Sequence, residues 1–114
     1  MISPLLLLAM AAPVHSSAPP PNPNNERQAF NKCLSAMLRP DLEKKTPADA
    51  FATKANAACT AEEATFRAAS MAADRAMGIR SAEAEQNAKS EITDIRSSTL
   101  ERYKGYLETN TAPR

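Results

Sequence analysis

Apolar residues between positions 25 and 108 recur at spacings of three and four, which is the period of one face of an α-helix. Four segments follow this pattern, and they are separated by short connectors. We expect helices over residues 25–39, 47–58, 61–77 and 81–108. Four helices with short connections predict an all-α fold, a small up-and-down bundle.

Each predicted helix has one face that we expect to enter the core. These faces are Phe30, Cys33, Leu34 and Met37; Phe51, Ala55 and Ala58; Phe66, Ala69, Ala73, Ala76 and Met77; and Ala88, Ile92, Ile95, Thr99, Tyr103 and Tyr106. On the surface of the third helix, Glu63 and Arg67 stand four residues apart and favour an ion pair. Much of the apolar content is alanine, and the chain has three Phe, two Tyr and no Trp, so the predicted core is thin.

Polar residues mark the helix starts. Each is a residue type that accepts hydrogen bonds from exposed helix N–H groups, and we expect N-caps at Asn25, Thr46, Thr60 and Ser81. Pro40 disfavours helical geometry at Arg39, so the first helix is expected to end there. Residues 41–45 are then a polar connector.

Gly78 decides between two architectures. Glycine followed by the apolar Ile79 is typical of a left-handed helix cap, after which the fourth helix folds back along the third. The rival is one continuous rod over both helices, whose apolar stripe would need a second copy of the chain or another protein. The early restart signal at Ser81 favours the break.

The N-terminal 24 residues differ in composition from the rest. Residues 1–18 contain an apolar run over positions 5–12 followed by small residues, which predicts a cleaved export signal, although no lysine or arginine precedes the run. The alternative is a disordered apolar N-terminus on a cytosolic protein. Residues 19–24 are a proline-rich spacer or, less simply, a polyproline ligand. The domain then covers 25–108, and 109–114 is a loose tail; export places the protein in the periplasm or outside the cell.

The two cysteines, Cys33 and Cys59, fall on expected core faces of neighbouring helices. A redox-active pair usually has two residues between its cysteines, whereas these are far apart in sequence. We therefore expect a structural disulfide, which suits an exported protein. With both thiols used, and without clustering of the methionines, no metal site or other cofactor is expected.

Charge and the length of the apolar run argue against two classes of partner, nucleic acid and membrane. Fourteen Lys and Arg against thirteen Asp and Glu give a net charge of +1, with both signs interleaved. Nucleic-acid binding proteins instead carry a one-sided basic field. The apolar run near the N-terminus is too short to span a bilayer, so stable membrane insertion is not expected.

Catalysis is also not expected. The single histidine, His15, lies in the presumed signal, so a mature chain has neither a histidine general base nor a Cys/His zinc site. Glu62 and Glu63 are adjacent and point about 100° apart on a helix, which does not aim both at one substrate. We predict that the protein is not an enzyme.

The C-terminal helix carries more apolar width than its length requires, through Leu100, Tyr103, Tyr106 and Leu107. These side chains are expected either to pack against the first helix or to bind a partner, which is another protein or a second copy of the chain. The first functional hypothesis is therefore an exported protein-binding or structural module. The alternative is a chaperone-like holder whose thin core opens to accept unfolded envelope proteins.

Overall fold

A computed structural model describes residues 22–114 of the chain. It contains five helices and, within those residues, no strand: α1 (Asn24–Ser35), α2 (Leu38–Glu43), α3 (Ala48–Ala57), α4 (Thr60–Ala76) and α5 (Ser81–Thr109). The all-α prediction is confirmed. The predicted export signal and residues 19–21 of the spacer lie outside the described residues.

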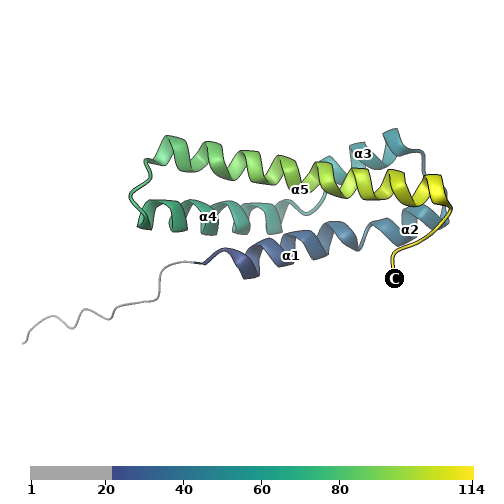
Figure 1. Cartoon of the computed structure of the whole chain (residues 1–114), viewed down its shortest axis with the longest axis horizontal. Coiled ribbons are helices and arrows are strands. Elements are labelled where there is room, and N and C mark those ends of the chain that lie inside the picture. Colours follow the sequence, from purple (N-terminus) through teal and green to yellow (C-terminus); the bar gives the residue numbers. More distant parts are fainter. Residues whose placement is uncertain (1–21) are drawn as a thin grey trace, which may run out of the picture.

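The helices make three passes along the length of the molecule (Figure 1). α1 and α2 follow one another in the first pass, α3 and α4 return in the second, and α5 covers the full length in the third. α5 packs mainly against α4 and α3, and also contacts α1 and α2. The fold is therefore a small helical bundle whose first two passes are each broken near the middle.

The first pass differs from the prediction. α1 ends at Ser35 rather than Arg39, and a short helix, α2, replaces most of the expected polar connector. Pro40 does not end a helix here, because it is the third residue of α2. Proline is tolerated in the first turn, since its missing N–H would have no partner there in any case.

The core consists of two clusters along the bundle. The first contains Phe30, Leu34, Phe66 and Ile92, and the second contains Leu38, Phe51, Ala55 and Tyr103. Aromatic rings stack in both: Phe30 on Phe66 at 6.2 Å between centroids, and Phe51 on Tyr103 at 3.8 Å. Met37, at the junction of α1 and α2, packs against both clusters and links them.

The predicted face of α4 is partly wrong. Phe66 is fully buried as expected, but the other buried residue of this helix is Ser70, and Met77 is 80% exposed. Met77 follows the last helical residue, so the helical period no longer directs it toward the core. Glu63 also does not pair with Arg67, because it faces Arg96 of α5.

The predicted side-chain N-caps are wrong, although the helix starts are close. α4 and α5 begin at the residue expected to cap them, α1 begins one residue before it, and α3 begins two residues after it. In none of these four helices does the N-cap side chain accept a hydrogen bond from the helix. The Thr46 hydroxyl donates to Asp41 instead, and the Ser81 hydroxyl accepts from Arg75. Asn25 does not cap α1 because it is already the second residue of the helix, and the N–H of the first residue, Asn24, donates to the Asn22 side chain at 3.0 Å.

The end of α4, in contrast, follows the expected backbone pattern. Gly78 has a φ of 85°, its N–H donates to the Arg75 carbonyl, and the Ile79 N–H donates to the Asp74 carbonyl. These two hydrogen bonds define a Schellman motif. The predicted break at Gly78 is confirmed, and the rod is excluded, because α5 folds back along α4.

Candidate functional site

The disulfide joins the last turn of α1 to the start of α4, so the predicted Cys33–Cys59 bond is confirmed. The two Cα atoms are 6.1 Å apart. Cys59 has a φ of 60° and occupies the single position between an extended Ala58 and the first residue of α4. This left-handed residue turns the chain out of α3 and into α4, and the disulfide holds the turn against α1.

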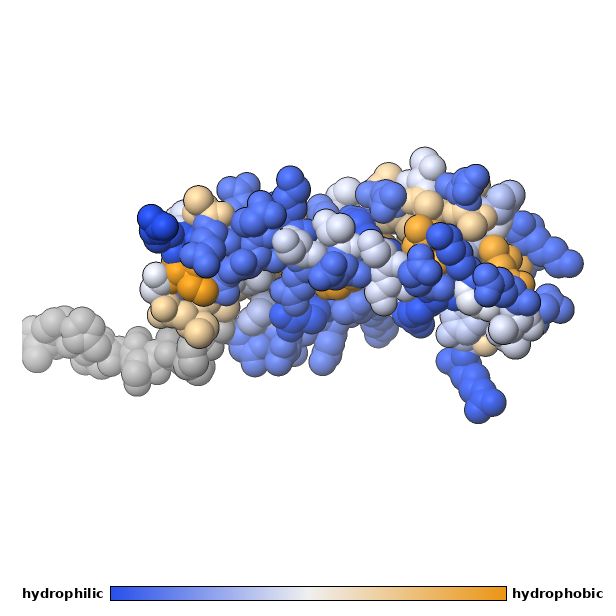
Figure 2. Space-filling view, turned by 45° about the horizontal axis from the view of Figure 1, so that its top comes forward, coloured by the Kyte–Doolittle hydropathy of each residue, from blue (hydrophilic) through white to orange (hydrophobic). Residues whose placement is uncertain are grey.

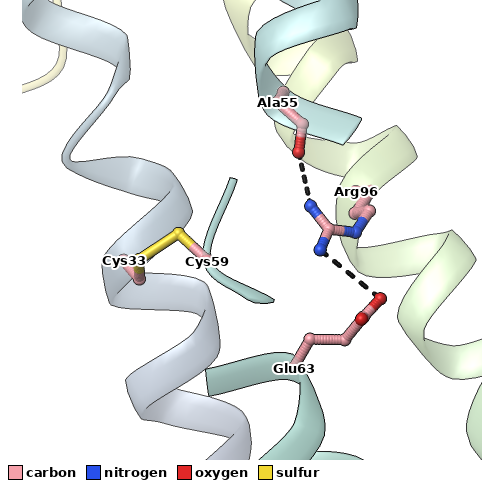
Figure 3. Close-up of a disulfide and its surroundings, with 5 residues drawn as sticks. All are labelled: Cys33, Ala55, Cys59, Glu63 and Arg96. Atoms are coloured by element: carbon pink, nitrogen blue, oxygen red, sulfur yellow. Dashed lines mark hydrogen bonds and ion pairs between the residues drawn. A yellow bond between two sulfur atoms is a disulfide. The ribbon is translucent and has the colours of Figure 1, made fainter. Parts of the chain in front are cut away.

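Arg96 of α5 fills the other side of the same break (Figure 3). Its side chain is buried, and its guanidinium donates to the carbonyl of Ala55 near the end of α3. The same group lies 3.4 Å from Glu63 in the start of α4 and 5.1 Å from the centroid of the Phe30 ring. One arginine thus contacts α1, α3 and α4 from α5, and it satisfies a carbonyl that the end of α3 leaves without a helical partner.

A second arginine, Arg27, contacts Phe66, the ring that stacks on Phe30. The Arg27 guanidinium lies 5.2 Å from the Phe66 centroid, and its Nε donates to Glu91 of α5 at 2.6 Å. With Arg96 on Phe30 and Phe30 on Phe66, the four side chains form one column through the first cluster. Cations on aromatic faces are stabilising, so this column supports a core that has few large apolar residues.

The second cluster contains a buried polar group around Asp41. Lys54 donates to its carboxylate at 2.7 and 3.0 Å, and the Thr46 hydroxyl donates at 2.8 Å. The Lys54 hydrogen bond holds the pKa of Asp41 below its usual range, against the opposing effect of burial. The Tyr103 hydroxyl donates to the Thr46 carbonyl, and burial raises the pKa of Tyr103. These contacts join the α2–α3 connector to α3 and α5.

One group of side chains has the spacing of metal ligands. The ligand atoms of Cys33, Cys59 and Glu62 lie within 4.8 Å of one another. Both sulfur atoms are used in the disulfide and carry no thiolate charge, so this group offers a metal ion only the Glu62 carboxylate while the bond is intact. Among residues 22–114 no other group of this kind is found.

The four residues predicted to bind a partner do not share one environment. Tyr103 is fully buried against Phe51, so it belongs to the core and is removed from the candidate binding surface. Leu100, Tyr106 and Leu107 are partly buried and pack against the second cluster. All four side chains therefore pack against the bundle, Tyr103 fully and the other three in part. The cluster that they contact is formed by α2, α3 and α5, whereas the sequence predicted packing against the first helix.

Two of these side chains also line a groove at the C-terminal end of α5. This groove, called here the apolar groove, has a volume of about 410 Å³. Its apolar residues are Leu42, Tyr106, Leu107 and Ala112, its charged ones are Arg39, Glu43 and Lys45, and Asn110 and Thr111 complete the lining. A smaller groove of about 310 Å³ lies between α1 and α4, and Glu26 and Glu62 both line it. Elsewhere on the face seen in Figure 2, hydrophobic residues form small separate patches among hydrophilic ones.

Sequence reasoning missed Arg96, although a signal was present. Arg96 stands four residues after Ile92 and three before Thr99, so it lies on the predicted core face of the last helix. Because arginine is rarely buried without a partner, a charged residue at this position indicates that partners meet it from other helices. The identity of those partners depends on the break between α3 and α4, which the period of one helix does not reveal.

No family model matches the chain, and comparisons with curated proteins and with solved structures give no match either. Within residues 22–114, no helix has the length and apolar character needed to cross a membrane.

Proposed function

We propose that this is an exported, non-catalytic helical protein that binds another protein through the apolar groove. The single observation that carries the proposal is the composition of this groove, in which Leu42, Tyr106 and Leu107 are bordered by Arg39, Glu43 and Lys45. Protein interfaces commonly have an apolar centre with a charged or polar rim.

Two further observations support a binding role over catalysis. Residues 22–114 contain no histidine, and both cysteines are in the disulfide. The most buried carboxylate, Asp41, is held by Lys54 and Thr46 and has a lowered pKa, which does not suit a general acid or base near neutral pH. The disulfide agrees with export, because such bonds persist in oxidising compartments.

Affinity capture from the envelope fraction of the native host tests the proposal. We expect the tagged, oxidised protein to retain one specific partner, Tyr106→Ala to lose it, and Met77→Ala to keep it. Met77 is a matched control because it is also apolar and is exposed just after the end of α4, outside the apolar groove. Melting curves verify that Tyr106→Ala still folds, and Lys45→Glu tests the rim without disturbing the core.

Three results would contradict the proposal. Equal capture by the Tyr106→Ala and Met77→Ala variants would exclude the apolar groove. Retention of many unrelated proteins, with suppression of aggregation of unrelated unfolded proteins, would favour the chaperone-like holder instead. A full-length mass in the cytosolic fraction would exclude export.

A further inference from the structure

In a third groove on the molecule, every charged side chain of the lining is positive. It lies where the junction of α1 and α2 meets α5 and the C-terminal residues, and it has a volume of about 520 Å³. Lys32, Arg39, Arg102 and Arg114 line it, and no carboxylate side chain does. We call it the basic groove. It collects four of the fourteen cationic side chains of a protein whose net charge is only +1.

These four cations have no ionic partner in residues 22–114. The ion pairs there use Arg27, Lys54, Arg96 and Lys104 instead. Arg102 donates to the Ser35 hydroxyl at 3.1 Å and Arg39 donates to the Pro113 carbonyl, so neutral groups orient both guanidinium groups without neutralising them. Like charges held around one hollow raise the local potential, which favours an anion there.

The remaining lining favours a peptide over a nucleic acid. Ala36, Leu38, Pro40 and Pro113 supply aliphatic surface, and no aromatic residue lines the groove. Single-stranded nucleic acids are usually held by aromatic side chains on which their bases stack. Arginine binds carboxylates and phosphates alike through two parallel hydrogen bonds, so the missing aromatic surface is what favours a peptide here.

We propose that the basic groove binds an acidic segment of the partner protein. The inference rests on the proposed function, because it gives the chemistry of the partner. Arg39 lines both the apolar and the basic groove. Residues 110–112 line the apolar groove, and the next two residues, 113–114, line the basic groove, so the two grooves are adjacent. A single extended segment can therefore place apolar side chains in the first groove and carboxylates in the second.

Fluorescence anisotropy with a labelled hexaglutamate peptide at low salt tests the basic groove directly. We expect the parent to bind the peptide and Arg39→Gln/Arg102→Gln to bind it at least about fivefold more weakly, which corresponds to losing two exposed charge pairs. Arg80→Gln/Lys89→Gln is the matched control, because it also removes two exposed cations and should change affinity less than twofold. Binding should weaken as salt is raised.

Additional variants and probes keep the test decisive. Lys32 makes no side-chain hydrogen bond or ion pair with residues 22–114, so Lys32→Gln weakens binding without disturbing the C-terminal residues, should the double variant fold poorly. Absence of hexaglutamate binding at low salt, or equal weakening by both double variants, would overturn the proposal. Tighter binding of tripolyphosphate or an oligothymidine strand, lost in Arg39→Gln/Arg102→Gln, would assign the groove to phosphates and also overturn it.

The two proposals fail separately. The peptide measurement uses purified protein and no partner. Peptide binding without any captured partner would leave the basic groove standing and reject the proposed function. Capture that depends on Tyr106, together with no peptide binding, would do the reverse.

Discussion

Within residues 22–114, three residues other than glycine have a left-handed backbone: Lys45, Cys59 and Asn110. Asparagine tolerates this conformation, and Cys59 is fixed by its disulfide, but lysine has no such compensation. Lys45 closes α2, with its own N–H on the Leu42 carbonyl and the Thr46 N–H on the Asp41 carbonyl. This is the same Schellman motif that glycine usually closes.

We expect Lys45→Gly to stabilise the protein by about 0.5–1 kcal/mol, because glycine adopts a positive φ without the steric cost. The free energy of unfolding from chemical denaturation measures the change. Lys44→Gly is the matched control: Lys44 is right-handed with a φ of −79°, so glycine there should destabilise. A loss of stability of equal size in both variants would contradict the assignment of strain to Lys45.

Asp41 is the buried carboxylate of the second cluster, and its folded pKa lies below the ordinary value of 3.8. The unfolded chain therefore binds a proton at higher pH than the folded chain does. The stabilisation is fully present above pH 3.8 and is lost as pH falls through the lower folded pKa.

Asp41→Asn should therefore destabilise the protein by about 1–3 kcal/mol at pH 7, the usual effect of losing a buried hydrogen bond to a charged group. The difference from the parent should shrink as pH falls below 3.8. Denaturation of both proteins between pH 7 and 2 measures it. Asp94→Asn, which removes an exposed carboxylate of α5, should show almost no difference at any pH. A constant difference for Asp41→Asn would rule out the ionic origin.

At the scale of helices, the sequence predicted the glycine cap that ends α4 better than the side-chain caps of the helix starts. The motif at Gly78 is local, because six consecutive residues form both of its hydrogen bonds. Two of the expected capping side chains make other hydrogen bonds, since the Thr46 hydroxyl donates to Asp41 and the Ser81 hydroxyl accepts from Arg75. Helical periods therefore predicted four helices, the disulfide and most core faces. Arg96 and the basic groove were missed because they depend on which helices meet across the bundle.

The two glycines give opposite predictions for the same substitution. Gly78→Ala should destabilise the protein by about 1 kcal/mol, because Gly78 has a φ of 85°, which is unfavourable for alanine. Nothing lies within 4 Å of an added Cβ, so the cost comes from the backbone conformation and not from a clash with neighbours. Gly105→Ala should stabilise by about 0.5–1 kcal/mol, because Gly105 lies inside α5 and also has open space around an added Cβ. Chemical denaturation of both variants beside the parent measures the signs. Stabilisation by Gly78→Ala as well as by Gly105→Ala would exclude the cap at Gly78.

At the scale of the whole molecule, the disulfide and Arg96 meet at one level of the bundle. The break between α3 and α4 lies there, with Cys59 held to α1 on one side and Arg96 reaching from α5 on the other (Figure 3). A small domain with few large apolar side chains has little stability to spare. We therefore expect the covalent bond to supply a large share of it.

The variant Cys33→Ser/Cys59→Ser should lose about 3–4 kcal/mol of unfolding free energy, the loop-entropy contribution for a bond closing 26 residues. Thermal and chemical denaturation measure the loss. A reductant should lower the parent to the level of the variant and leave the variant unchanged. A loss below about 1 kcal/mol would show that Arg96 and the packing around it hold the break without the bond.

The same bond has a mechanical consequence. If the chain is pulled from its two ends, the segment between the cysteines, which stand 26 positions apart, bears no load, since tension passes through the sulfur atoms. α2 and α3 lie within that segment. In a single-molecule pulling experiment, the oxidised chain should extend roughly 80 Å less than the reduced one, at about 3.4 Å per residue. In an oxidised chain under tension, the α2 residues that line the apolar and the basic groove would thus remain in a loop that carries no force.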